Sequence, residues 1–391
     1  MLKNHDIIYM AGHDYNLTDC KISTDHIAGQ LSVHNRVLYV ESVGLRSPRM
    51  NKNDMGRILR KVKRFFRLPK KINERFYVIS PVVIPFHHVP VVSKLNQMLL
   101  VLYIRAVCLF LGFRKPILFI FLPSMYGVVG RLKEVLSVYY CTDEHSQFPG
   151  VDRSSIKRME MEILKKVTLG FATSPQILEE KKKINSSFYL SMHGVDYDNF
   201  SKAQDPALTI PEDIINIKGP VIGYFGAVDR WMDLDLIHYL VKQRRDWSFV
   251  IIGKTVVDIS LFDNEPNIHF LGQRPFSELP AYGKKFDVAL IPFLLNELTR
   301  HVFPVKLKEY LAMGKPVVSS ALPPVEEFNK INPDAVMIGY GHSDFLSKIE
   351  KSFAFNTEAF IQNRQRLVKK DTWEARGEEV SEIIEKHLDS V

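Results

Sequence analysis

The sequence predicts an α/β protein made of two doubly wound units, each with a parallel sheet covered by helices on both faces. Strand-like runs alternate with segments of helical length through most of the chain. These runs are almost continuously apolar and rich in β-branched residues, as is typical of strands buried on both faces of a sheet. The length of 391 residues exceeds what one ordinary core holds, so two domains are expected.

The expected strands fall into two series separated by a proline-containing stretch. Between many of them lie segments with helical periodicity, such as Ser23 to His34 and Arg153 to Val167. The first series is DIIYMA (6–11), RVLYVESV (36–43), FYVISPVVI (76–84), PILFIFLP (116–123), SVYYCTD (137–143), LGFATS (169–174) and FYLSMHG (188–194). The second is PVIGYFGAV (220–228), WSFVIIGK (247–254), NIHFLGQ (267–273), DVALIPF (287–293), PVVSSA (316–321) and AVMIGY (335–340). The stretch Ser201 to Pro220 carries three prolines and few periodic apolar residues, which indicates a linker. Ligands of such sheets bind beyond the carboxyl ends of the strands, so we expect a cleft between the two sets of strand ends.

The net charge of +8 is concentrated in one segment. From Arg46 to Lys71 there are eleven Lys or Arg residues and a single acid, Asp54, interleaved with apolar residues. Such a segment can lie on an anionic membrane surface, or it can form a solvated loop or a helix packed on its own domain. No zinc-finger, helix-turn-helix or RNA-binding signature accompanies the charge, so a nucleic-acid partner is not expected.

A second apolar run, Met98 to Phe113, is shorter than the roughly 20 residues that span a bilayer, and Arg105 interrupts it. It predicts a buried or partly membrane-facing helix and a protein that touches a membrane without crossing it. Three scattered cysteines, Cys20, Cys108 and Cys141, exclude a disulfide framework or a zinc site and favour a reducing compartment. The chain opens on a strand-like pattern, from which we expect no cleaved signal peptide.

Two stretches of the second series carry candidate chemistry. Gly223 and Gly226 close its first strand, where glycine lets a backbone approach a phosphate, and Arg230 follows in the same turn. These features also suit an ordinary strand-to-helix turn with a surface arginine. Asp233 and Asp235 resemble a metal-binding pair, but their place before an apolar helical pattern favours first-turn charges of a helix.

The stretch HVFPVKLKEYLAMGKPVVSS (301–320) predicts a helix from near Pro304 to Met313, ended by Gly314 in the left-handed conformation. Lys306 falls in its first turn, where a cation opposes the helix dipole unless an anion is bound. Glu309 lies on the same face one turn along. A lysine beside free backbone N–H groups suits a nucleotide diphosphate, and the carboxylate can accept both hydroxyls of a ribose.

These motifs resemble the donor-binding half of GT-B glycosyltransferases of the family-4 type. The resemblance is strongest to the bacterial polysaccharide branch that includes teichuronic acid glycosyltransferases and the xanthan glucuronosyltransferase GumK. It rests on PVKLKEYLAMGKPVVSS (304–320) and NIHFLGQRPFSELPAYGKKFDVALIPF (267–293), with YYCTDEHSQFPGVD (139–152), ATSPQILEEKK (172–182), MHGVDYDNF (192–200) and TWEARGEEV (372–380) in the family's order.

The resemblance implies a role for several residues of the second domain. Lys306 would hold the donor diphosphate and Glu309 the ribose, Leu271 and Gly272 would lie near the base, and Gly226 would approach the phosphates. The expected domains are residues 1–203 for acceptor and membrane, 204–372 for the nucleotide-sugar donor, and 373–391 as a C-terminal helix packing back on the first domain.

Two departures from the family pattern bear on mechanism. His301 occupies the position, eight residues before Glu309, where the family has a second glutamate, and Glu297 is out of register. Ala227 and Met232 replace the usual basic pair after the glycine turn, with Arg230 as a possible substitute. Both departures favour an inverting, GumK-like reaction, which needs a general base. Asp143 at the end of SVYYCTD is the first candidate and His13 the second. Glu144 and His145 are neighbours that can shift the pKa of Asp143. An N-cap is the structural alternative for Asp143.

The sequence therefore predicts a metal-independent glycosyltransferase without a cofactor. It would transfer a sugar from a nucleotide diphosphate, with UDP expected, to a lipid-linked or growing surface polysaccharide, on the cytoplasmic face of the inner membrane. A nucleotide-sugar epimerase of the same fold would need no basic membrane segment. A catalytically inactive membrane scaffold would bind a nucleotide without consuming a nucleotide sugar.

Overall fold

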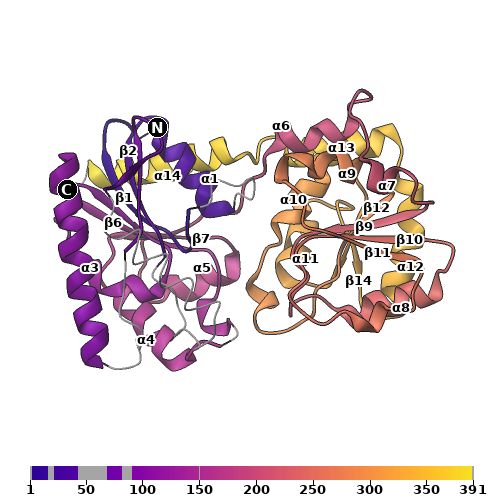
Figure 1. Cartoon of the computed structure of the whole chain (residues 1–391), viewed down its shortest axis with the longest axis horizontal. Coiled ribbons are helices and arrows are strands. Elements are labelled where there is room, and N and C mark those ends of the chain that lie inside the picture. The colour runs from indigo at the N-terminus through magenta and orange to yellow at the C-terminus, as the bar shows by residue number, and fades with distance from the viewer. Residues whose placement is uncertain (1, 16–21, 43–67, 82–89, 149, 390–391) are drawn as a thin grey trace. The chain divides into compact units, whose positions relative to one another are not determined.

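The computed structural model describes residues 2–15, 22–42, 68–81, 90–148 and 150–389, which form two compact α/β units. The described residues up to Met192, together with those from Arg376 onward, make the first unit, and His193–Ala375 make the second. Each unit has a largely parallel sheet flanked by helices, as the sequence predicts (Figure 1).

The first unit holds an eight-stranded sheet in the order β3-β4-β2-β1-β5-β6-β7-β8. Its neighbouring strands are parallel except for the antiparallel pair of β3 and β4. The strands are β1 (Asp6–Met10), β2 (Arg36–Val40), β3 (Lys70–Lys71), β4 (Phe76–Ile79), β5 (Ile117–Ile120), β6 (Leu136–Cys141), β7 (Leu169–Ala172) and β8 (Phe188–Leu190). The order reverses direction between β1 and β5, which makes the carboxyl ends of these central strands the natural place for a ligand.

Two helices of the first unit, α4 and α5, begin at side-chain caps that the sequence offers. The Asp152 side chain accepts a hydrogen bond from the backbone N–H of Ser154, and the Ser174 side chain accepts one from that of Ile177. The helices are α1 (Ser23–Ser32), α3 (Pro90–Leu111), α4 (Arg153–Leu164), α5 (Pro175–Lys182) and α14 (Trp373–Leu388), with 3-10 turns η1 (Pro123–Val128) and η2 (His145–Gln147). From Arg376 onward, α14 belongs to the first unit.

The second unit holds a six-stranded, fully parallel sheet in the order β11-β10-β9-β12-β13-β14. The strands are β9 (Val221–Phe225), β10 (Ser248–Ile252), β11 (Ile268–Gly272), β12 (Val288–Ile291), β13 (Val317–Ser320) and β14 (Met337–Gly339). In chain order this is 3-2-1-4-5-6, the doubly wound arrangement of dinucleotide-binding domains, with its reversal between β9 and β12.

Helices cover both faces of this second sheet. They are α6 (Tyr197–Phe200), α7 (Glu212–Ile215), α8 (Leu234–Gln243), α9 (Leu279–Lys284), α10 (Val305–Ala312), α11 (Pro323–Ile331), α12 (His342–Ser352) and α13 (Glu358–Val368). The 3-10 turns are η3 (Ser201–Gln204), η4 (Ser260–Phe262), η5 (Phe276–Glu278), η6 (Thr299–His301) and η7 (Phe353–Phe355). Asp233 caps α8 by accepting from the backbone N–H of Leu236, in accord with the helix-charge interpretation of that acid.

Two sequence expectations need correction. The stretch Ser201 to Pro220 is not a linker, because η3 and α7 lie in it and it belongs to the second unit, whose start at His193 precedes the expected boundary at 203/204. The apolar run from Met98 is part of a longer helix, α3, which has 22 residues because Val91, Val92 and Leu95 continue the apolar pattern towards the N-terminus. Most of the basic segment Arg46 to Lys71 lies outside the described residues.

Candidate active site

The glycine turn after β9 and the start of α10 meet in the second unit, although 80 residues of sequence separate them. A Cβ atom added to Gly226 would lie 2.0 Å from Cε and 2.6 Å from Nζ of Lys306, so the lysine side chain lies directly against the glycine. The Lys306 Nζ is also 5.7 Å from the centre of the Tyr224 ring. Glycine at 226, with a φ of +141°, leaves space for the lysine in this position, which is the juxtaposition the sequence predicts for a phosphate site.

A second contact fixes the same turn against its neighbours. The Gly226 N–H donates to the Ile252 carbonyl at 2.7 Å, and the Gly253 N–H donates to the Gly272 carbonyl at 2.9 Å. A Cβ on Gly253 would lie 1.9 Å from the Gly226 carbonyl oxygen. The carboxyl ends of β9, β10 and β11 are therefore packed backbone to backbone. The sequence analysis did not single out Gly253 for this close packing. The available signal was a glycine directly after an apolar strand.

Helix α10 begins where the sequence expects it, with Pro304 at the N-cap and Gly314 beyond its end at a φ of +72°. On its inner side, Lys308 Nζ donates to the His193 carbonyl at 2.8 Å and pairs with Asp371 at 2.7 Å. Lys308 is almost fully buried, so this pair fixes the rotation of α10 and with it the direction of Lys306 and Glu309. No local feature of the sequence indicates this role of Lys308.

The two candidate donor-binding charges are half-buried. Burial lowers the pKa of Lys306, and the negative charge of Glu309 opposes that effect. Burial raises the pKa of Glu309 to about 7; the charge of Lys306 counteracts this and that of Asp196 adds to it. Asp196 caps α6 by accepting from the Asn199 N–H and was not among the expected site residues. Since burial disfavours both charged forms, a bound diphosphate would compensate Lys306 directly.

The remaining expected donor residues lie at the same edge of the sheet with different exposure. Leu271 is half-buried in β11, and Gly272 follows it at a φ of +73°. Arg230 is exposed in the turn after β9, and its backbone N–H donates to Asp229 Oδ1 at 2.7 Å. Its contacts within the described residues do not include Lys306 or Glu309, so the structure does not join Arg230 to them.

In the first unit, Asp143 follows the carboxyl end of β6, and the turn after it is held by backbone hydrogen bonds. The His145 N–H donates to the Asp143 carbonyl at 3.0 Å, and Cys141 Sγ donates to the same oxygen at 3.4 Å. The side chain is half-buried and has no ion-pair partner among the described residues. Burial raises its pKa to about 7, and a hydrogen bond with Thr142 acts in the opposite direction. A carboxylate with that pKa can act as a general base near neutral pH.

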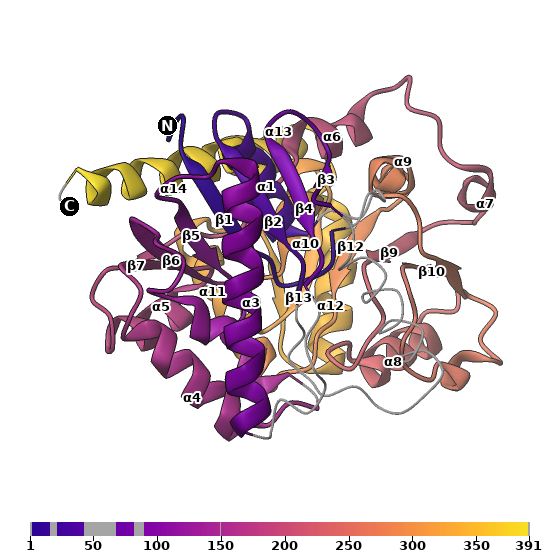
Figure 2. The same ribbon diagram turned by 60° about the vertical axis from the view of Figure 1, so that its left-hand side comes forward.

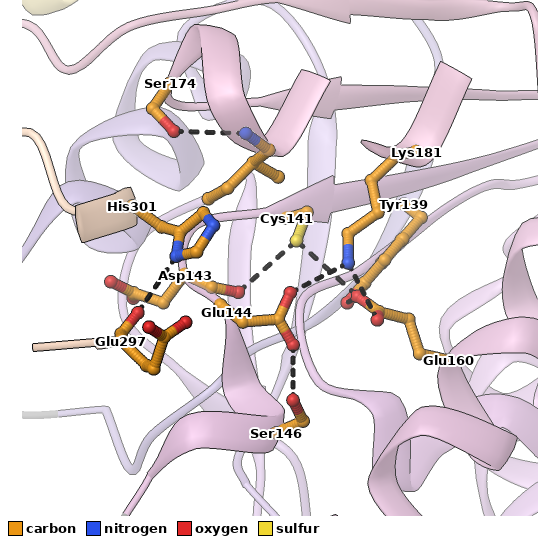
Figure 3. Close-up of polar contacts among 11 residues, drawn as sticks. Tyr139, Cys141, Asp143, Glu144, Ser146, Glu160, Ser174, Lys181, Glu297 and His301 are labelled. Carbon is orange, nitrogen blue, oxygen red and sulfur yellow. Dashed lines mark hydrogen bonds and ion pairs between the residues drawn. The ribbon is translucent and has the colours of Figure 1, made fainter. Parts of the chain in front are cut away.

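Beneath Asp143 lies a buried ionic network that the sequence did not reveal (Figure 3). Lys181 Nζ donates to Glu144 at 3.1 Å and to Glu160 at 2.9 Å. Ser146 donates to Glu144 at 2.6 Å, and Tyr139 donates to Glu160 at 2.8 Å. Glu144 is therefore engaged in structure rather than free to exchange protons.

The neighbouring His145 has its pKa lowered by burial, against the opposing charges of Glu160 and Glu144, and so it is neutral at pH 7. This neutral ring packs edge-on against Phe148, with the ring centres 5.4 Å apart. The two residues after Asp143, Glu144 and His145, thus anchor its turn.

The second candidate base, His13, follows β1 and lies in a cluster with α1. Its Nε2 is 2.9 Å from Asp25 Oδ1 and 3.2 Å from the Tyr39 hydroxyl, and its Nδ1 is 3.3 Å from the Thr24 hydroxyl. Tyr39 also donates to Asp25 at 3.1 Å. Both ring nitrogens of His13 thus face protein partners, whereas Asp143 has no such ion pair. Asp143 as the general base, with His13 as the alternative, stays a prediction.

Comparison with known proteins agrees with this arrangement. Residues 219–352 match the family model described as glycosyl transferases group 1. This stretch of the chain contains Gly226, Lys306 and Glu309. The chain is 26% identical over 247 residues to TuaH of Bacillus subtilis (strain 168), whose name assigns it as a glycosyltransferase of teichuronic acid biosynthesis. That alignment covers 60% of this chain and 62% of TuaH, so the chain spans about three fifths of the relative's length.

Solved structures of similar fold cover nearly the whole chain. Sucrose-phosphate synthase from Thermosynechococcus elongatus has a TM-score of 0.72 at 14% identity and covers 100% of both chains. HepE of Anabaena in complex with UDP has a TM-score of 0.65 at 12% identity, covering 98% of this chain and 100% of its own. At these identities the likeness establishes the fold, which is GT-B.

The solved structures give this chain a GT-B fold, and residues 219–352 match the group 1 glycosyl transferase model, in line with the resemblance. Over three fifths of its length, the chain is similar to a glycosyltransferase named for teichuronic acid biosynthesis.

Proposed function

We propose that this protein transfers a glycosyl group from a UDP-sugar to a lipid-linked or growing surface polysaccharide, in the synthesis of a capsule, exopolysaccharide or cell-wall polymer. The observation that carries the proposal is Lys306 lying against Gly226, with Glu309 one turn along, at the strand-order reversal of the second sheet. The group 1 family match, the relation to TuaH and the UDP bound to HepE support it.

In this proposal the second unit holds the donor. Lys306 and the free N–H groups at the start of α10 neutralise the diphosphate, Gly226 admits it, and Leu271 and Gly272 border the base. Glu309 accepts the ribose hydroxyls in its ionised form. Because Lys306 and α10 supply positive charge, the reaction needs no metal, a prediction that turnover in the presence of EDTA would test.

The chemical step is an inverting substitution at the anomeric carbon. The acceptor hydroxyl attacks that carbon, and its proton passes to the Asp143 carboxylate. The new glycosidic C–O bond forms as the bond from the anomeric carbon to the donor phosphate breaks, and UDP leaves with the electron pair. His13 is the alternative base. His301 in place of a family glutamate supports inversion; analysis of the anomeric configuration of the product would decide this.

The membrane surface is part of the proposal. A lipid-linked acceptor lies at the inner face of the cell membrane, and the eleven basic residues of Arg46 to Lys71 suit attraction to its anionic lipids. On this basis we place the protein in the cytoplasm, peripheral to the membrane.

Thermal denaturation in the presence of UDP, GDP or ADP tests the donor site, because a ligand that binds the native state raises the melting midpoint. We expect a rise with UDP for the wild type and none for Lys306→Ala, while Lys351→Ala, an exposed helical lysine of the same unit, keeps the rise. A rise that persists in Lys306→Ala would contradict the proposed diphosphate site.

His301 at the position of a family glutamate supports one competing function, an inactive scaffold. A scaffold would show the UDP effect but would release no UDP from any UDP-sugar when membranes containing the acceptor are supplied. Release of UDP coupled to incorporation of the sugar into lipid would exclude it.

A further inference from the structure

Helix α3 of the first unit has two apolar faces, and the structure uses only one of them. The buried face packs on the sheet through Leu100, Val101, Ile104 and Val107, which belong to the core cluster of this unit. These positions recur every three or four residues, as expected for one stripe of a helix with about 3.6 residues per turn. An ordinary surface helix would be polar on the opposite side.

The opposite side of α3 is instead apolar and exposed. Leu109 is 83% exposed, Val91 75%, Phe110 65% and Leu102 55%, and Leu95, Met98 and Leu99 are also exposed. Their spacing again follows the helical period, so they form one continuous stripe running nearly the whole length of α3, which we call the outer face. In Figures 1 and 2 no other described element of the first unit covers it. A stripe of this size on a soluble surface marks an interaction site.

The charged residues that α3 and the turn after it carry themselves are all positive. From residue 90 to 115 the chain contains Lys94, Arg105, Arg114 and Lys115 and no aspartate or glutamate. All four basic side chains are exposed. Lys94 and Arg105 fall three turns apart on one border of the outer face, where their long side chains can reach a headgroup layer while the apolar residues lie below it.

Three occupants of such a face can be compared. The 21 residues Val91–Leu111 are long and apolar enough to cross a bilayer by length and composition, with a mean hydropathy of 1.6. A span would need every side of the helix to leave the sheet, yet the inner side carries part of the core. A second copy of the chain would bring a face with the same positive border and no acid to pair with it, so like charges would oppose self-association. An anionic bilayer satisfies both the apolar stripe and its basic border.

We propose that the outer face of α3 lies in the interface of an anionic lipid bilayer, parallel to the membrane plane, and holds the first unit at its surface. This inference rests on the proposed function and deepens it, because it assigns membrane attachment to a folded helix rather than to the basic segment Arg46 to Lys71 alone. Apolar insertion along α3 supplies the salt-resistant part of binding, and the basic residues supply the salt-sensitive part.

The test is flotation of the full chain with vesicles of phosphatidylglycerol and phosphatidylethanolamine, compared with vesicles of phosphatidylcholine alone. The test variant is Leu102→Gln with Leu109→Gln, two exposed positions at which glutamine keeps helix propensity. Its matched control is Ile331→Gln on α11, an isoleucine that is 75% exposed on the second unit. Circular dichroism and the UDP thermal shift confirm that each variant folds and keeps its donor site.

We expect the wild type and Ile331→Gln to float with anionic vesicles at both low and high salt. The double variant should bind at least about tenfold more weakly at high salt, because two apolar side chains no longer enter the interface. A double variant that floats as well as the wild type at high salt would overturn the proposal. So would a wild type that dimerises in sedimentation without lipid and becomes monomeric in the double variant, because the occupant would then be a second copy. Failure of the UDP shift in the wild type would sink the donor proposal alone, so the two failures are distinguishable.

Discussion

Lysine lies beside glutamate in two settings of this protein, one buried and one half-buried, and the pKa of the lysine shifts in opposite directions in the two. In the first unit, Lys181 lies between Glu144 and Glu160 and bonds to both. Burial lowers its pKa, but the acidic groups Cys141, Glu160 and Glu144 outweigh burial and raise it above the ordinary value. In the second unit, Lys306 has only Glu309 acting against burial, and its pKa is lowered.

The difference separates structure from function. The Lys181 network is complete within the protein, with hydroxyl donors on both carboxylates. Burial disfavours the charged forms of Lys306 and Glu309, and under the proposed function a diphosphate and a ribose would offset that cost. A buried cation that the protein pairs fully stabilises the fold, and one that it pairs incompletely is available to a ligand.

The largest effect on stability is expected at Lys181. Replacing it by Met leaves two buried carboxylates without their cation, which costs about 3–5 kcal/mol of unfolding free energy. Urea denaturation would measure this loss. The triple variant Lys181→Met, Glu144→Gln, Glu160→Gln should recover part of it, because no unpaired charge then remains buried. If the single variant is as stable as the wild type, the network is not the structural element described here.

Lys306→Ala should lower activity without lowering stability, in contrast to Lys181→Met. We expect kcat to fall about 10²–10³-fold, the loss typical when one group that stabilises developing negative charge is removed. The melting midpoint without ligand should stay the same or rise, because an incompletely paired cation is gone. Sugar-transfer kinetics and thermal denaturation of the same preparation measure both. If Lys306→Ala is strongly destabilised, Lys306 stabilises the fold as Lys181 does, and its role in donor binding is contradicted.

The Asp143 pKa of about 7 predicts the acid limb of the reaction. A general base must be ionised, so turnover at saturating donor should fall about tenfold per pH unit well below pH 7 and level off above it. Asp143→Asn should lower kcat by about 10²–10⁴-fold. The matched variant His13→Gln distinguishes the two candidate bases: if it, rather than Asp143→Asn, removes the acid limb, His13 is the base.

The raised pKa of Glu309 predicts that the free energy of unfolding falls as pH rises, whereas turnover through Asp143 rises with pH. The effect of Glu309 is the smaller of the two. Its pKa in the folded protein, about 7, lies above the ordinary value of 4.5. The folded state therefore binds this proton more tightly than the unfolded state. The stability from this group is full below pH 4.5 and is lost as pH rises through 7. The melting midpoint of Glu309→Gln without ligand should gain on the wild type between pH 5 and pH 8, and equal midpoints throughout would contradict the raised pKa.

The smallest effect is expected at Arg230. Because it is exposed and not joined to Lys306, Arg230→Gln should raise the donor KM only about two- to fivefold with kcat unchanged, as for a solvent-screened charge contact. Donor-saturation kinetics measure this. A loss of kcat comparable to that of Lys306→Ala would mean that Arg230 closes onto the diphosphate in the bound state.

The sequence by itself determined most of the elements and the residues of the proposed donor site. Strand and helix identities follow from short-range periodicity, and the ends of α10 follow from Pro304 and Gly314, whose backbone preferences act locally. The glycine turn at 226 and the pair Lys306 and Glu309 were also readable, because turn chemistry and helical spacing are local properties of the chain.

Only the tertiary structure decided which distant groups meet. Lys181 contacts Glu144 and Glu160, which lie 37 and 21 residues away in the sequence. Lys308 contacts the His193 carbonyl, 115 residues away. Nothing in local spacing encodes such pairs, because they depend on which strands lie side by side. Tertiary packing also decided which side of α3 is buried. Both sides of this helix are apolar, and only the side that packs on the sheet is covered, so the outer face is exposed.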